Sequence, residues 1–114
     1  MRLLVVFLLL VLPVPAAAFE RVADRGAFLA LVEGKRLTGD GVSLRVGRDG
    51  SIAGRGFGFR VTGGWSWQDG YFCRTLQSAI RYFPLNCQVV AVRGDVVRFV
   101  ADRGAGDVAD LRIR

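Results

Sequence analysis

Three patterns of hydrophobic and polar residues follow one another along the 114-residue chain. The first is an unbroken apolar run, Leu3–Leu12. The second, Asp24–Glu33, has apolar residues at helical spacing, and from Lys35 onward apolar and polar residues alternate with a period of two. We therefore expect a leading apolar segment, one helix and then a series of strands.

The leading segment has the features of a cleavable signal peptide in the usual order. Arg2 gives a positive start to the apolar run, and Pro13–Pro15 ends any helix after it. Ala16–Ala18 then offers the small side chains that signal peptidase requires. The run is about half the roughly 20 residues that span a bilayer, which favours cleavage over the alternative of an uncleaved N-terminal anchor.

This interpretation predicts a signal peptide over residues 1–18 and one β-rich domain over residues 19–114. The mature protein is then periplasmic or secreted, with no stable membrane anchor after cleavage. A domain of this size buries only about 60 to 65% of its unfolded surface, so covalent cross-links add useful stability.

The helical pattern covers one short segment. Asp24 is placed to cap its N-terminus, and Gly34 is placed to end it. Phe28, Leu31 and Val32 fall on one face, so we expect this helix to pack against another part of the fold.

The alternating segments are typical of strands with one buried and one solvated face. Asp-Gly or Gly-Asp turn signals separate several of them, as hairpins require: Arg48–Gly50, Gln68–Gly70 and Arg93–Asp95. The predicted fold class is mainly β: a small antiparallel β-barrel, or a strongly curled meander, of six to eight strands between residues 36 and 114. It carries one N-terminal helix. The strands are expected around four runs: Val42–Val46, Phe57–Thr62, Val97–Phe99 and Ala109–Ile113.

One segment departs from this alternation. Arg74–Asn86 is apolar without a clean period, and Pro84 interrupts regular structure. We expect a long loop here.

The chain has two cysteines, Cys73 and Cys87, at opposite ends of that segment. A redox pair favours a short C-x-x-C spacing, and a zinc site requires four ligands. In an exported protein the pair predicts a structural disulfide. It would join the end of one strand to the start of the next. Closing this loop would stabilise the folded domain by about 3 kcal/mol.

The charge balance is basic, and histidine is absent. Without Arg2, fifteen basic residues face ten acidic ones, all but one of the basic residues being arginine, and they are scattered along the chain. Such a balance is compatible with weak attraction to anionic surfaces, polysaccharide or acidic proteins, but arginines that alternate on the solvated strand faces are the favoured interpretation. No basic cluster indicates nucleic acid, which we do not expect as a partner. The lack of histidine removes the commonest general base and metal ligand.

Two glycine-rich segments are candidates for a cofactor or metal site. Gly54–Gly58 lacks the full G-x-G-x-x-G pattern and is followed by a strand, which favours a bend over a dinucleotide site. Asp102–Asp107 carries two carboxylates, but calcium takes six to eight oxygen ligands, so a glycine turn between the last two strands is favoured. No catalytic, cofactor-binding or metal-binding residue is predicted.

Aromatic side chains gather in the hairpin before the first cysteine. If Asp69–Gly70 is a two-residue turn, Trp67 faces Phe72. If the turn has three residues, Trp67 faces Tyr71. The register decides which aromatics join the core, and most of the cluster is expected there because large aromatics dominate small interiors. An exposed Trp or Tyr that acts as a recognition anchor is the alternative. The candidate recognition surface comprises Trp65, Trp67, Tyr71, Asp102, Arg103 and Asp107.

Three segments carry a resemblance: W-S-W-Q-D-G-Y-F-C at Trp65–Cys73, N-C-Q at Asn86–Gln88 and D-R-G-A-G-D at Asp102–Asp107. With them the chain resembles a group of short exported alphaproteobacterial proteins of unknown function. Some of these bear the label dihydrodipicolinate reductase, an enzyme family with a Rossmann domain and a histidine-bearing substrate motif, neither of which this sequence has. The Gly63–Trp65 strand and one disulfide are also similar to periplasmic lipocalin-like inhibitor barrels.

These observations predict a non-enzymatic periplasmic binding or interaction module. Its partner is expected to be a protein, as for an inhibitor-like barrel, or an envelope component, as for an envelope-associated barrel. No cofactor is expected. The alternative is an enzyme of the dihydrodipicolinate reductase label.

Overall fold

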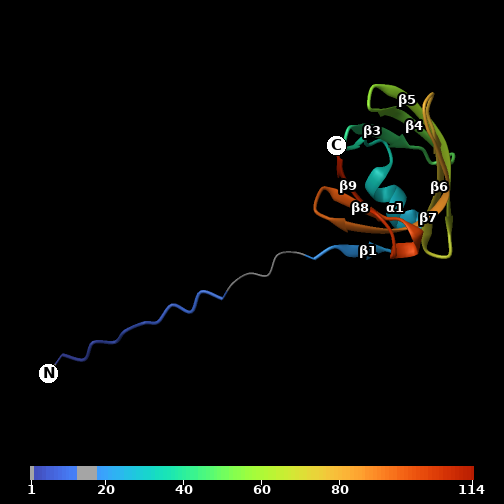
Figure 1. Cartoon of the computed structure of the whole chain (residues 1–114). Helices are drawn as coiled ribbons and strands as arrows, with labels where there is room; N and C mark the ends of the chain where they lie inside the picture. The colour runs from blue at the N-terminus through green and yellow to red at the C-terminus, as the bar shows by residue number, and fades with distance from the viewer. Residues whose placement is uncertain (1, 13–17) are drawn as a thin grey trace.

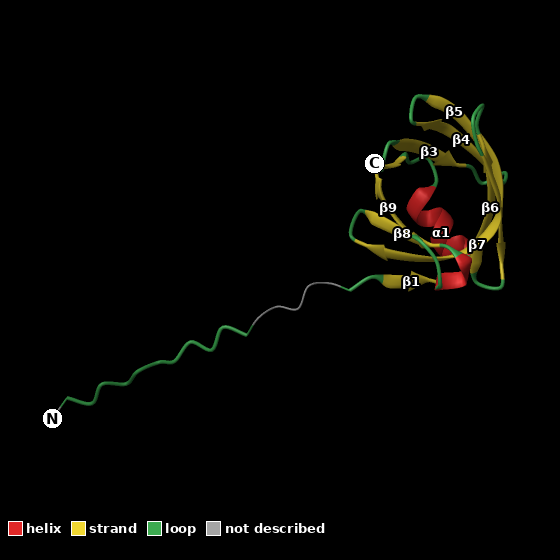
Figure 2. Cartoon of the chain, viewed as in Figure 1, coloured by secondary structure: helices red, strands yellow, loops and turns green. Residues whose placement is uncertain are grey.

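The computed structural model describes residues 2–12 and 18–114 (Figures 1 and 2). Within these residues the chain forms nine strands, one α-helix and one short 3-10 helix. The helices are α1 (Arg25–Val32) and η1 (Asp102–Gly104). The strands are β1 (Glu20–Val22), β2 (Leu37–Gly39), β3 (Val42–Val46), β4 (Ser51–Gly56), β5 (Phe59–Gln68), β6 (Tyr71–Gln77), β7 (Tyr82–Arg93), β8 (Val96–Val100) and β9 (Val108–Ile113).

Eight of the strands form a closed antiparallel barrel. The order around it is β7-β6-β5-β4-β3-β2-β9-β8, and the β7–β8 pairing closes the ring. The ninth strand, β1, pairs with Val90–Val92 near the C-terminal end of β7, beyond the residues of β7 that pair with β6. The predicted fold class is confirmed, and the eight strands after residue 36 match the predicted number.

All three predicted turns join neighbouring strands. The β5–β6 register pairs Trp67 with Phe72 and Gln68 with Tyr71, so Asp69 and Gly70 form the two-residue turn of the two alternatives. Both turn residues have positive φ, 52° and 83°, as a type I′ hairpin turn requires. This register sends Trp65, Trp67 and Phe72 toward the helix.

Two expectations about the strands were wrong. Phe57 does not belong to a strand: Phe57 and Gly58 form the turn between β4 and β5, with φ of 51° and 84°. The run Phe57–Thr62 therefore contains a turn before its strand begins at Phe59. Alternation alone could not separate the two, because an exposed turn aromatic looks like a buried strand position in the sequence.

The predicted loop over Arg74–Asn86 is also wrong. β6 continues to Gln77 and β7 begins at Tyr82, so most of the segment is a hairpin. The register shifts between Arg74 and Leu76, where β7 carries an extra residue around Pro84. A proline is tolerated there because it lies at a bulge on a strand with no partner on its other side. The bulge also disrupts the alternation in the sequence.

The predicted helix is confirmed. The Asp24 carboxylate accepts a hydrogen bond from Ala27 N–H at 2.8 Å, which caps the first turn. Gly34 follows the helix with a φ of 71°, the left-handed conformation that glycine adopts most readily.

The helix lies inside the barrel (Figure 2). Its aromatic side chain, Phe28, belongs to the buried core. Phe28 is fully buried, with ring centroids 5.4 Å from Trp65, 5.1 Å from Phe72 and 6.3 Å from Phe99. These rings come from three different strands, β5, β6 and β8, so one helical residue packs against a continuous half of the barrel wall. Gly63 allows β5 and β6 to approach closely, because a Cβ there would clash with the Thr75 carbonyl oxygen.

The N-terminal residues 2–12 run as an exposed, extended segment away from the barrel (Figure 1). The predicted helix-ending residues Pro13–Pro15 and most of the predicted cleavage site, Ala16–Ala17, lie outside the described residues. Across the described ranges, no helix has the length and hydrophobicity that crossing a membrane requires. Every strand, helix and core residue described lies between Glu20 and Ile113, so residues 19–114 carry their own core.

Candidate functional site

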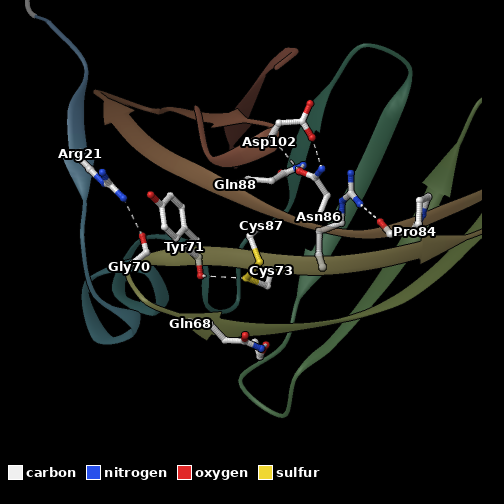
Figure 3. The surroundings of a disulfide bond; sticks show 12 residues. Arg21, Gln68, Gly70, Tyr71, Cys73, Pro84, Asn86, Cys87, Gln88 and Asp102 are labelled. Atoms are coloured by element: carbon white, nitrogen blue, oxygen red, sulfur yellow. Dashed lines mark hydrogen bonds between the residues drawn. A yellow bond between two sulfur atoms is a disulfide. The ribbon is translucent and has the colours of Figure 1, made fainter. Parts of the chain in front are cut away.

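Three segments far apart in the sequence meet around the disulfide bond (Figure 3). Cys73 and Cys87 are bonded and lie directly opposite each other on β6 and β7. The predicted disulfide is confirmed. Its expected position is corrected: it links the inner parts of two neighbouring strands, not two strand ends flanking a loop.

Beside the disulfide, side-chain hydrogen bonds form a clamp between β7 and η1. The Asn86 amide group donates to the Asp102 carboxylate at 2.7 Å, and its oxygen accepts the Asp102 backbone N–H at 3.0 Å. Gln88 donates to the same Asn86 oxygen at 3.4 Å. β8 ends opposite Val89, so beyond that point the clamp replaces strand pairing along this edge of β7.

The clamp brings Arg103 over a tyrosine. Arg103 lies 5.5 Å from the centre of the Tyr71 ring, and Arg21 lies 5.1 Å from the same ring. Arg21 also donates to the Gly70 carbonyl oxygen at 3.3 Å, which fixes its position over the β5–β6 turn. Tyr71 is half-buried, with two guanidinium groups against its ring. Such cation–π contacts contribute about 0.5–1 kcal/mol each at exposed sites.

The six predicted surface residues therefore separate into four groups. Tyr71, Asp102 and Arg103 come together at the junction. Trp65 belongs to the core: it is 8% exposed, and its indole N–H donates to the Gly47 carbonyl oxygen at 2.8 Å. Trp67 is half-buried against Phe28, with its indole N–H 3.3 Å from the Ala23 carbonyl oxygen.

Asp107 lies apart from these contacts. Its side chain is exposed, and its backbone oxygen accepts a hydrogen bond from Ala101 N–H at 2.9 Å. The favoured interpretation of Asp102–Asp107 as a turn between the last two strands is confirmed. Among the described residues, no three His, Cys, Asp or Glu side chains gather where a metal ion could bind.

Two further aromatic rings also lie between pairs of arginines. Phe19 has Arg93 at 4.4 Å and Arg98 at 3.9 Å from its centre. Phe83 has Arg81 at 4.5 Å and Arg74 at 5.9 Å. Sequence reasoning missed these contacts, because each ring and at least one of its arginines come from different strands or from the N-terminal segment.

Ion pairs neutralise part of the basic surface. Arg98 and Asp110 are 2.8 Å apart, and the guanidinium group holds the pKa of Asp110 below its ordinary value. Arg48 lowers the pKa of Glu33 in the same way, at 2.8 Å. In the described ranges, Arg21 and Arg103 are not in ion pairs, so the Tyr71 junction, with two guanidinium groups and the Asp102 carboxylate, keeps a net positive charge.

Two open grooves lie on the outside of the barrel. The larger, about 580 Å³, follows β2 and β9 and is lined by Arg93, Arg112 and Arg114, with Arg112 paired to Asp95 at 3.0 Å. The smaller, about 420 Å³, lies between the start of β5 and the β6–β7 turn. Every buried side-chain nitrogen or oxygen in the described residues has a hydrogen-bond partner. The unsatisfied polar groups available to a ligand are therefore on the surface.

Comparison of the chain with family models, with curated proteins and with solved structures finds no match. The resemblance to short exported alphaproteobacterial proteins and to lipocalin-like inhibitors stays a prediction. The three motif segments nevertheless lie side by side in the structure. They contribute the disulfide, the Asn86–Asp102 clamp and the arginine contact on Tyr71.

Proposed function

We propose that the mature protein is an exported, non-enzymatic interaction module that acts in the periplasm or outside the cell. It binds an anionic protein or envelope component through the outer face of the barrel. The observation that carries this proposal is the junction where Arg21 and Arg103 flank Tyr71. Arginine and tyrosine are enriched among the residues that dominate binding energy at interfaces.

The packed interior supports binding on the outside. Phe28 fills the centre of the barrel against rings from β5, β6 and β8, where barrels that carry small molecules have a cavity. A partner then has the outer strands and turns to contact, and these carry an excess of arginine. Attraction of an anionic partner to such a surface weakens as salt is added.

The position of Phe19 supports cleavage after Ala18. Phe19 is held between Arg93 and Arg98, so the packed domain begins at the predicted first residue of the mature protein. Mass spectrometry of the exported protein is expected to show an N-terminus at Phe19, within a residue or two. Retention of Met1 in a membrane fraction contradicts export by cleavage.

The binding proposal is tested by capture of partners from periplasmic extract. We expect wild-type protein to retain a specific partner that the double variant Arg21→Gln and Arg103→Gln loses. Arg45→Gln is the matched control, because Arg45 is an exposed arginine on β3 that stacks on no ring in the described residues. Equal capture by all three proteins contradicts recognition at the junction. Micromolar affinity for a nicotinamide cofactor in calorimetry contradicts the non-enzymatic proposal and favours the reductase alternative.

A further inference from the structure

Large apolar side chains are exposed at two neighbouring hairpins of the barrel. We define the hairpin tips as residues 54–62, between β4 and β5, and residues 77–86, between β6 and β7. Five large side chains in these ranges are exposed, by 39 to 75%. They are Phe57, Phe59, Ile80, Tyr82 and Leu85.

The two tips form one surface. The groove of about 420 Å³ is lined by residues from both, including Arg60 from β5 and Tyr82 from β7. Thr62 and Gln77 face each other across the strands beneath it. The β4–β5 and β6–β7 hairpins project at the same end of the barrel (Figure 1).

The backbone at Phe57 is unfavourable for the residue that occupies it. Its φ is 51°, in the left-handed region that costs a non-glycine residue about 1–2 kcal/mol. Asn-Gly is the favoured sequence for such a turn. The Phe57 ring contacts Gly41, yet the residue remains 75% exposed, so little burial offsets the cost. A strained, exposed aromatic at a turn is consistent with selection for contact with a partner.

The charge of the tips is entirely positive. Residues 54–62 and 77–86 contain Arg55, Arg60 and Arg81 and no aspartate or glutamate. None of these three arginines is in an ion pair within the described chain. The neighbouring β2–β3 turn adds one carboxylate, Asp40, so the tips and this turn together keep a net positive charge.

The tips are poorly suited to pairing with another strand. β7 lacks a partner on its β8 side before Val89, so Tyr82–Leu85 is an open edge. Pro84 has no N–H to donate, and the bulge beside it interrupts the ladder. What the tips offer is their apolar side chains with arginines between them.

We propose that the hairpin tips bind the surface of an anionic lipid bilayer. Phe57, Ile80 and Tyr82 enter the boundary between headgroups and acyl chains, as apolar side chains of peripheral proteins do. Arg60 and Arg81 contact lipid phosphates, and hydroxyl and amide groups of Thr62, Ser78 and Gln77 line the groove beside Arg60. The inference rests on the proposed function in one respect: the domain must reach an envelope membrane.

The test is co-sedimentation of residues 19–114 with lipid vesicles. Vesicles of phosphatidylglycerol mixed with phosphatidylcholine are compared with vesicles of phosphatidylcholine alone. We expect binding to the first kind, weakened by salt. Phe57→Asn combined with Tyr82→Ser is expected to weaken it at least about tenfold, and Arg60→Gln with Arg81→Gln at least about fivefold. Val108→Thr, which alters an exposed apolar residue on β9 outside the tips, is the matched control and leaves binding unchanged.

The outcomes separate this inference from the proposed function. No binding to anionic vesicles overturns it, as does binding that salt weakens but the Phe57→Asn and Tyr82→Ser change leaves intact. Loss of a captured periplasmic protein with these tip variants, without vesicle binding, assigns the tips to a protein partner and also overturns it. A changed oligomeric state of the tip variants in size-exclusion chromatography assigns them to self-association instead. None of these results alters what the Arg21 and Arg103 variants show about the junction.

Discussion

The centre of the barrel and the hairpin tips use phenylalanine in opposite ways. Phe28 is fully buried inside the ring of strands, whereas Phe57 is 75% exposed at a turn. Phe28 contacts four other aromatic rings and sits in a capped helix. Phe57 sits in a left-handed conformation that asparagine or glycine would adopt at lower cost.

This difference separates the residues that stabilise the fold from the residues that are available to bind a partner. The central aromatic rings form much of the buried core. The indole N–H groups of Trp65 and Trp67 donate to the backbone oxygens of Gly47 and Ala23. The tips contribute little to the core yet carry large exposed apolar groups and arginines that form no ion pair with the described residues. Changes at the centre are therefore expected to lower stability, and changes at the tips to alter binding with little effect on stability.

The largest effect is expected from Phe28→Ala. Removing a fully buried phenylalanine costs about 3–5 kcal/mol of unfolding free energy. Domains of this kind are typically stable by about 5–15 kcal/mol, so the variant is close to unfolding. Phe57→Asn is the contrast: its free energy of unfolding is expected to stay within about 0.5 kcal/mol of wild type or to rise, because Asn-Gly suits the turn. Urea unfolding of both variants checks this, and equal losses contradict the comparison.

The disulfide is expected to have the next largest effect. Replacing both Cys73 and Cys87 with alanine should lower stability by about 3 kcal/mol and the melting temperature by about 10–25 °C. Both cysteines lie inside paired strands, so the bond restrains the unfolded chain more than it alters the barrel. Calorimetry measures the loss, and thiol labelling of native protein is expected to find no free thiol. Two reactive thiols contradict a structural bond.

A smaller effect is expected at the clamp. Asn86→Ala removes both hydrogen bonds to Asp102 and should cost about 1 kcal/mol, because the exposed partners regain bonds to water. Hydrogen exchange of the Asp102 amide is expected to accelerate while amides of β3 and β4 keep their protection. An unchanged Asp102 exchange rate shows that η1 is held by other contacts, such as Gly104 against Val89.

The smallest effect concerns pH. Glu33 and Asp110 have pKa values below their ordinary range because Arg48 and Arg98 bond to them. Such groups stabilise the fold above the pKa of the unfolded chain, near pH 4, and that contribution is lost as pH falls through the lower folded pKa. Stability should therefore decline slightly below about pH 4.5, and less so in a variant with Glu33→Gln and Asp110→Asn. An identical acid decline in this variant contradicts the assignment.

Local patterns predicted most of the fold. The Asp24 cap, the helical spacing of Phe28 and Val32, and the Asp69–Gly70 turn all depend on residues close together in the chain. They were correct for that reason. The errors arose where local signals were ambiguous. Phe57 continued an alternating pattern through a turn, and Pro84 at a bulge hid the β6–β7 hairpin.

The candidate site was less predictable because its residues come from distant segments. Tyr71 and Arg103 were expected at the surface, but nothing in the sequence placed Arg21 against the same ring or Asn86 against Asp102. Trp65 could not be assigned to the core until the register was known. Gly58 was the usable signal for the tips, since an isolated glycine within an alternating run indicates a break in the regular strand.

NMR spectroscopy of isotope-labelled protein, titrated with anionic lipid discs, tests the separation of centre and tips most directly. The indole N–H groups of Trp65 and Trp67 report on the centre, since both are bonded to backbone oxygens beside the helix. We predict that amide signals of residues 57–60 and 78–85 shift or broaden, while both indole signals stay unchanged. Shifts at the indoles with unchanged signals at the tips would contradict the account.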